Sequence, residues 1–272
     1  MLNKSTKIIF FSFLIFLVSC GDKEKKLDNT RTESPEYLYS VASNLLNDEK
    51  FEEAREVFQN LKNQYPLTNE GINAQIMMAF IKYVQMEYID AILQFDRIIR
   101  EYPSHKNIDY AYYMRAMCYY EQIEKETLDG TNNKKALENF NQVIKRFPDS
   151  KYTRDSEQKV ILVKENIAAK HMNIGHYYLK QKKYIAALNR YNKVINEYSV
   201  TKFTPEALYR QVEIYYALGI LDQANKTASV ISYNYPKSIW YEYAYNLLNK
   251  KDENKSFVNK LSNLLKKNDS EQ

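Results

Sequence analysis

One spacing of apolar residues recurs five times along the 272-residue chain and limits its fold more than any other feature. Each copy has an alanine, apolar residues four and seven positions later, an aromatic residue at position eleven and, in four copies, proline at position twelve. Positions 4, 7 and 11 residues apart share one face of an α-helix, and proline cannot continue that helix. The leading residues are Ala54, Ala91, Ala136, Ala187 and Ala224.

The spacing predicts an all-α fold of stacked helix pairs, because a single helix pair cannot bury its own apolar face. It resembles the tetratricopeptide repeat, whose unit is about 34 residues long. The leading alanines lie 37, 45, 51 and 37 residues apart, so every unit carries extra residues. We expect a tetratricopeptide-repeat solenoid of five helix pairs with C-terminal capping helices, and one extended helix over about 152–182.

The first residues are typical of a secretory signal peptide. Two lysines precede an apolar run over 8–18 that is too short to span a bilayer. The segment Leu17-Val18-Ser19-Cys20-Gly21 at the end of this run resembles a bacterial lipobox. The resemblance implies a covalent diacylglycerol and an N-acyl lipid on Cys20, no other cofactor, and attachment to the outer membrane, because residue 21 is not an inner-membrane-retaining aspartate. The alternative is an ordinary signal peptide with an incidental cysteine.

We divide the chain into a signal peptide at 1–19, a lipidated polar tether at 20–34, five repeats at 35–236, and a C-terminal helical extension and tail at 237–272. A loop is expected over 124–133. The pair Thr204-Pro205 predicts a helix N-cap followed by proline at the first helical position. Basic and acidic residues (39 and 34) are interspersed, so no nucleic-acid partner is expected.

Catalytic and metal sites find little support in the residue inventory. His171 and His176 are five residues apart and do not share a helix face as a metal-binding pair does. Cys118 lies in an apolar helix, where we expect it to be buried. Five glycines form no phosphate-binding loop. We do not expect an enzyme; a thiolate–imidazole pair with a distant histidine is the alternative left open.

Several segments together resemble the BamD family of outer-membrane assembly lipoproteins. They are the segments 102–115 and 147–152, the loop before Ala136 and the long helix after it, and the lipobox with its short tether. The resemblance covers about 35–235 and ends after Pro236, where familiar members stop. It implies a subunit of the β-barrel assembly machinery on the periplasmic face of the outer membrane.

The resemblance also implies two partners. The C-terminal repeats dock onto POTRA domains of the barrel-forming BamA-type subunit, and the N-terminal repeats receive unfolded outer-membrane β-barrel proteins. The family's docking arginine matches Arg190, whose planar fork is suited to a bidentate carboxylate pair. The alternative is an exposed arginine on a solvated helix face.

The 25 tyrosines suggest a concave groove for an aromatic peptide. Candidates from first helices are Tyr83, Tyr112 and Tyr119, although aromatic residues at helical spacing more often pack between repeats. The competing function is another repeat lipoprotein of the envelope, an adaptor in cell-wall synthesis, secretion or gliding. The binding partner separates the two functions.

Overall fold

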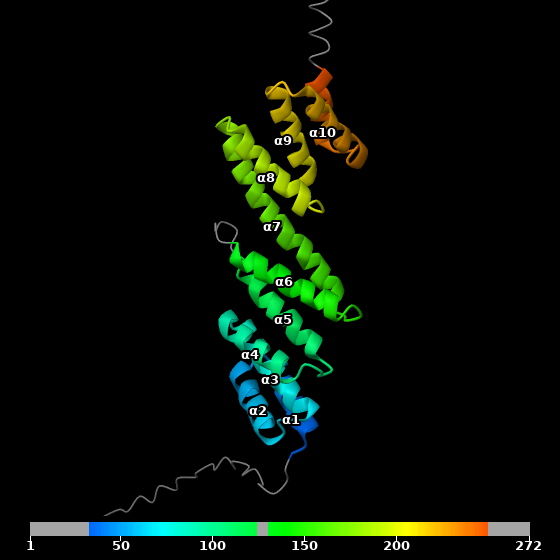
Figure 1. The fold of residues 1–272 in the computed structure, drawn as a ribbon. Helices are drawn as coiled ribbons and strands as arrows, with labels where there is room; N and C mark the ends of the chain where they lie inside the picture. Colours follow the sequence, from blue (N-terminus) through cyan, green and yellow to red (C-terminus); the bar gives the residue numbers. More distant parts are fainter. Residues whose placement is uncertain (1–32, 124–129, 250–272) are drawn as a thin grey trace, which may run out of the picture. The chain divides into compact units, whose positions relative to one another are not determined.

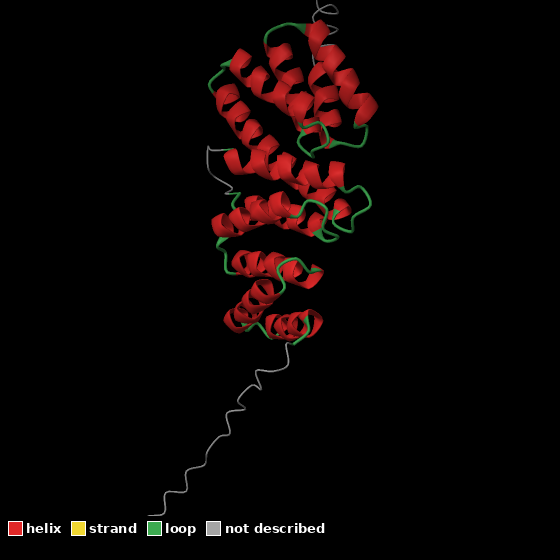
Figure 2. Cartoon of the chain, turned by 60° about the horizontal axis from the view of Figure 1, so that its bottom comes forward, coloured by secondary structure: helices red, strands yellow, loops and turns green. Residues whose placement is uncertain are grey.

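The fold is all-α throughout the part of the chain that is described. The structure is a computed structural model, and it describes residues 33–123 and 130–249. No strand occurs within those residues, and short turns join the helices (Figure 2). The predicted signal peptide, the tether up to residue 32 and the tail from 250 lie outside the described residues.

Ten helices form the five predicted pairs, which confirms that expectation. The first helices are α1 (Pro35–Asn47), α3 (Asn69–Val84), α5 (Ile108–Glu121), α7 (Thr153–Lys180) and α9 (Thr204–Ala217). The second helices are α2 (Phe51–Gln64), α4 (Tyr88–Glu101), α6 (Thr131–Arg146), α8 (Tyr184–Glu197) and α10 (Leu221–Asn234). Each helix packs against the next one in the chain (Figure 1). A further helical segment occupies 239–249.

The repeated spacing marks the buried face of every second helix. All five leading alanines are fully buried, and so is the residue seven positions after each of them. Alanine at the first position lets the neighbouring helix approach closely, and the larger apolar residue fills the space between the helices. The residues at position seven are Leu61, Ile98, Val143, Val194 and Ile231.

The aromatic residue at position eleven ends every second helix in the same way. Its N–H donates to the carbonyl of the position-seven residue, and its φ lies between −135° and −126°. Where proline follows, ψ is between 50° and 59°. Tyr198, which precedes Ser199, has a ψ of 33°. Proline disfavours the helical region for the residue before it, which explains the larger ψ in four copies.

Two expectations about helix starts need correction. Thr204 is the first residue of α9 and does not cap it; its hydroxyl instead donates to the carbonyl oxygens of Tyr198 and Ser199, at 3.3 and 3.1 Å. The hydroxyl therefore closes the preceding turn, and Pro205 falls one position later than expected. The loop predicted over 124–133 also ends earlier than expected, because α6 begins at Thr131.

Four of the turns inside the pairs contain a residue with positive φ. The angles are 61° at Glu49, 62° at Met86, 55° at Lys182 and 76° at Gly219. In the first turn Lys50 N–H donates to the carbonyl five residues back at 2.9 Å, the bond that defines a Schellman ending. Three of these positions therefore hold a side chain where glycine has the lowest conformational cost.

Replacing a left-handed residue by glycine should stabilise the protein. We expect Glu49→Gly, at an exposed position, to raise the free energy of unfolding by about 1 kcal/mol, and Gly219→Ala to lower it by about the same amount. Chemical denaturation measures both. Asp48→Gly is the control, because Asp48 does not adopt a left-handed conformation and glycine there should lower the free energy of unfolding. A higher free energy of unfolding in Asp48→Gly would contradict the conformational explanation.

Candidate functional site

Helix α7 is twice as long as most of the others and is buried along two different faces. Its buried positions are Thr153, Ser156, Val160, Val163, Ala168, Met172 and Gly175. Steps of three and four residues keep one face, but the step of five places Ala168 about 140° around the helix from Val163, at 100° per residue. Val163 shares a core with α5 and α6, whereas Ala168 shares one with α8 and α9.

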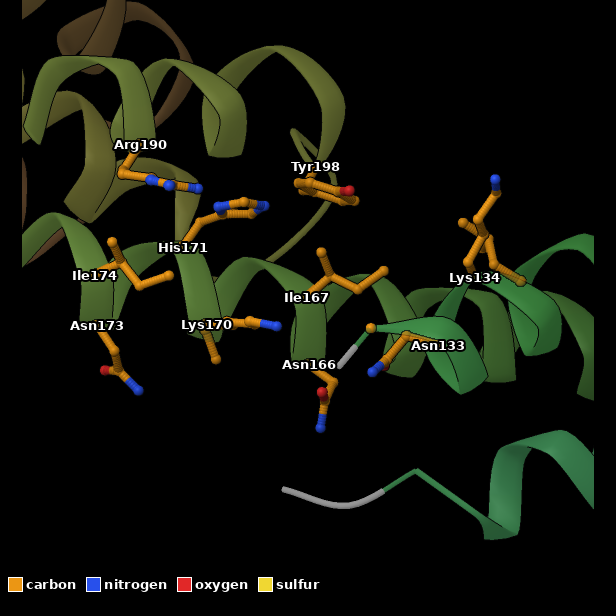
Figure 3. A pocket seen from close by; sticks show the side chains of 13 residues that line it. Asn133, Lys134, Asn166, Ile167, Lys170, His171, Asn173, Ile174, Arg190 and Tyr198 are labelled. Atoms are coloured by element: carbon orange, nitrogen blue, oxygen red, sulfur yellow. The ribbon is translucent and has the colours of Figure 1, made fainter. Parts of the chain in front are cut away.

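A groove of about 890 Å³ lies between α6, α7 and α8, where the buried face changes (Figure 3). Its basic side chains are Lys134 from α6, Lys170 from α7 and Arg190 from α8. Apolar side chains, among them Ile167 and Ile174, line the rest together with asparagines. No carboxylate belongs to this lining within the described residues, although Lys134 contacts a carboxylate oxygen of Glu138 at 3.9 Å. The lining therefore combines basic, amide and apolar side chains.

His171 lies between Arg190 and Tyr198 in this groove (Figure 3). The rings of His171 and Tyr198 are stacked, with centroids 6.0 Å apart and an interplanar angle of 23°. The Nδ1 atom of His171 is buried and has no hydrogen-bond partner among the described residues. Burial lowers the pKa of His171, and the charges of Lys193 and Arg190 lower it further. The ring is therefore neutral near pH 7.

Arg190 is half-buried, and no hydrogen bond or ion pair joins it to another residue of the described ranges. Other half-buried arginines are paired within the chain. Arg115 contacts the Asp96 carboxylate at 2.5 Å, and Arg210 contacts that of Glu213 at 3.0 Å. In Figure 3 the guanidinium of Arg190 points toward the ring of His171. Its five donors therefore remain for a partner.

A glycine on α7 sets the distance to α8 beside this site. A Cβ atom added at Gly175 would lie 2.6 Å from Cε1 and 2.9 Å from Cζ of Tyr191. Tyr191 is fully buried, so its ring has little room to move. The missing side chain at Gly175 therefore lets α8 approach, and with it Arg190, the residue next to Tyr191.

A side chain at Gly175 should destabilise the fold. We expect Gly175→Val to lower the free energy of unfolding by about 1–3 kcal/mol, the usual cost of overpacking. Denaturant unfolding measures the change. Asn173→Val, at an exposed position of the same helix, controls for a β-branched residue in a helix and should cost well under 1 kcal/mol. Equal losses in both variants would contradict the packing role.

The three candidate tyrosines lie in different surroundings. Tyr112 is only 6% exposed, packs against Phe147 and accepts a hydrogen bond from Arg146 at 3.0 Å. Its ring is a core element and does not present a face to a peptide, which corrects that expectation. Tyr83 and Tyr119 are half-buried. Burial raises the pKa of both, and they stay candidates for a peptide surface.

Tyr83 and Tyr119 also have contacts of their own. The Tyr83 hydroxyl donates to a Glu121 carboxylate oxygen at 3.3 Å, and its ring lies 5.7 Å from that of Tyr88. The ammonium of Lys135 lies 5.3 Å from the ring centre of Tyr119. No ring contact joins the three candidate tyrosines to one another among the described residues, so they do not form one stacked surface.

Other sequence candidates are found in unreactive surroundings. Cys118 is fully buried, as expected, and burial raises the pKa of its thiol to about 12. Within residues 33–123 and 130–249, no group of three or more acidic, histidine or cysteine side chains is arranged to hold a metal ion. Across the same ranges, no helix combines the length and apolar character needed to cross a bilayer. Cys20 lies outside the described residues.

Comparisons with known proteins identify the family. The family model described as the outer membrane lipoprotein YfiO matches residues 31–230. A protein of Rickettsia prowazekii named outer membrane protein assembly factor BamD is 38% identical over 245 residues, covering 90% of this chain and 98% of that protein. The BamD of Caulobacter vibrioides is 35% identical, covering 86% and 77% of the two chains.

Among solved structures, the TPR2AB domain of yeast Sti1 is similar with a TM-score of 0.44 and 13% identity, covering 79% of this chain and 81% of that chain. The resemblance to the BamD family is confirmed by the family model and by these relatives together. The chain therefore belongs to the YfiO family of outer membrane lipoproteins, which includes the assembly factors named BamD.

Proposed function

We propose that this chain is a lipoprotein subunit of the β-barrel assembly machinery, held at the periplasmic face of the outer membrane. It scaffolds the barrel-forming subunit and receives unfolded outer-membrane proteins for folding and insertion. The family match over 31–230 and the relatives named as assembly factors support this proposal. In the structure, the observation that carries it is Arg190, a half-buried arginine with no partner in the described chain, at the edge of the groove between α6, α7 and α8.

Docking through Arg190 follows from charge-assisted hydrogen bonding. A carboxylate of a POTRA domain would accept two parallel hydrogen bonds from the guanidinium group of Arg190. Partial burial would make this ion pair stronger than the same pair in water. Among the described residues that line the groove, no carboxylate competes for the arginine. The chain supplies the basic partner of such a pair, and the barrel-forming subunit supplies the acidic one.

The receptor part of the proposal concerns the N-terminal repeats. Half-buried tyrosines such as Tyr83 and Tyr119 offer partly exposed ring faces on first helices, and an aromatic segment of an unfolded protein can stack on such faces. Nothing in this role requires bond chemistry, so we propose a scaffold and receptor and not a catalyst. The relatives favour this function over that of an adaptor in cell-wall synthesis, secretion or gliding.

Lipidation of Cys20 should hold the protein at the membrane. We expect Cys20→Ala to move most of the protein from the outer-membrane fraction to the periplasmic or precursor pool, because several acyl chains stabilise attachment by about 0.8 kcal/mol per buried methylene. Cell fractionation and intact-mass measurement test this. Cys118→Ala is the control and should leave fractionation unchanged. An unlipidated wild-type protein that still fractionates with the outer membrane would contradict the anchor.

Reversing the charge of Arg190 should weaken docking to the barrel-forming subunit. We expect Arg190→Glu to reduce affinity about 30-fold or more, because a carboxylate pair becomes a like-charge contact, while the denaturation midpoint stays nearly unchanged. Co-purification and surface binding measure the first effect, and chemical denaturation the second. Arg154→Glu, at an exposed position of α7, is the matched control. Equal binding by both variants would remove Arg190 from the interface.

A further inference from the structure

We infer that two neighbouring turns of the repeats contact a bilayer that contains anionic phospholipid. The turns are residues 180–185, between α7 and α8, and residues 217–222, between α9 and α10; together they are called the basic edge. In this contact, aliphatic side chains enter the interface and lysines meet lipid phosphates. The inference goes beyond the proposed function, because it adds a membrane contact of the folded repeats to the proposed anchor at Cys20.

The two turns of the basic edge form one surface. A hollow of about 670 Å³ is lined by residues of the first turn, among them Lys182, Lys183 and Ile185, and by Leu218 of the second turn. In Figure 1, α7 and α9 both end toward the top of the ribbon. A flat partner can therefore meet side chains of both turns at once.

The aliphatic side chains of the basic edge are exposed. Ile185 is 76% exposed, and Leu218 and Ile220 are each 44% exposed. One exposed aliphatic residue is ordinary, but several on adjoining turns form an apolar patch of the kind that marks an interaction surface. Removing these side chains from water would favour binding to any apolar environment.

The lysines of the basic edge distinguish among such environments. Lys180, Lys182 and Lys183 are exposed, and no ion pair or hydrogen bond joins their ammonium groups to another residue of the described ranges. The carboxylate of the two turns is Asp222, so basic groups are in excess. A lysine near an anionic bilayer raises the affinity about fivefold. Its long stem lets the ammonium group reach a phosphate while a neighbouring aliphatic side chain enters the interface.

The turn between α3 and α4 has the same apolar exposure with the opposite charge. Met86 is 75% exposed and Ile89 is 71% exposed. The ammonium group of Lys82 lies 2.6 Å from a Glu87 carboxylate oxygen and 3.7 Å from one of Asp90. Acidic groups therefore exceed basic ones over residues 82–90, and an anionic surface would repel this turn. The contrast assigns the lipid contact to the basic edge.

A bilayer fits the basic edge better than a folded partner does. Lysine carries a compact charge on a flexible stem, which suits lipid headgroups that move in the plane of the membrane. A fixed carboxylate on a protein is better matched by the planar fork of arginine. Lysines beside exposed aliphatic side chains are typical of surfaces that lie in a membrane interface. A bilayer is also the surface that an outer membrane lipoprotein meets.

A fluorescent probe on the lipidated protein in vesicles tests the contact. The probe is a nitrobenzoxadiazole group attached to Gln181→Cys, which leaves the lysines and aliphatic side chains in place. Cys118 is fully buried and does not compete for the label. The matched position is Gln85→Cys, because both glutamines are exposed and each lies six residues before a leading alanine. Vesicles contain phosphatidylcholine with or without phosphatidylglycerol.

We expect the probe at position 181 to emit at shorter wavelength and to be quenched by spin-labelled lipid when phosphatidylglycerol is present, because the probe then lies in the interface. The probe at position 85 should remain in water. Lys182→Gln and Lys183→Gln should each lower the ratio of shifted to unshifted emission about fivefold. Ile185→Asn should also lower it, whereas Ile89→Asn, at the matching position of α4, should not.

Three outcomes would overturn the inference. Equal emission from positions 181 and 85 in vesicles with phosphatidylglycerol would remove the basic edge from the membrane. An equal shift without phosphatidylglycerol would exclude recognition of anionic lipid. A shift that appears only when the barrel-forming subunit is added would make the edge a protein interface. If the protein floats with the vesicles while the probe at 181 stays in water, the lipid anchor stands and only the edge contact is excluded.

Discussion

The stacking of helix pairs depends on each helix burying one apolar face, and α7 meets this condition with two faces in succession. Its first half completes the core of the preceding pair, and its second half forms a pair with α8. The change of face between Val163 and Ala168 leaves a stretch where neither core covers the helix completely. The groove occupies that stretch. The extra length that separates Ala136 from Ala187 is thus the origin of the candidate site.

Most of the fold was predictable because the repeated spacing encodes burial directly. Each leading alanine is fully buried, and each second helix ends at the aromatic residue before the turn. The ends of the first helices were harder to predict. Glu49, Met86 and Lys182 adopt positive φ without being glycine, so the usual marker of such a turn is missing. Thr204 was misassigned because its hydroxyl has carbonyl oxygens of the preceding turn within reach.

The site was predictable only in part. Arg190 came from a resemblance, and the structure adds that it has no internal partner in the described chain. His171 showed no signal, because its proximity to Arg190 depends on which way the second half of α7 faces. The five-residue step from Val163 to Ala168 sets this direction. It cannot be recognised from the sequence, because neighbouring apolar residues such as Ile161 and Leu162 are exposed although their residue type predicts burial. Tyr112 was predicted to line a groove because it lies on a first helix, but its ring is buried. The position of a tyrosine on a first helix therefore does not tell whether its ring is exposed.

An unpartnered arginine is compatible with stability because Arg190 is only half-buried. Water still solvates part of its guanidinium, so the free protein avoids the several kcal/mol that a fully buried charge would cost. In the proposed complex a partner would cover the groove and displace that water, and a carboxylate would be the best replacement for it. The same desolvation would penalise any partner that brings an apolar or a basic group to this position. In the proposed docking role, the arginine therefore contributes more to the choice of the surface that docks beside α8 than to the stability of this fold.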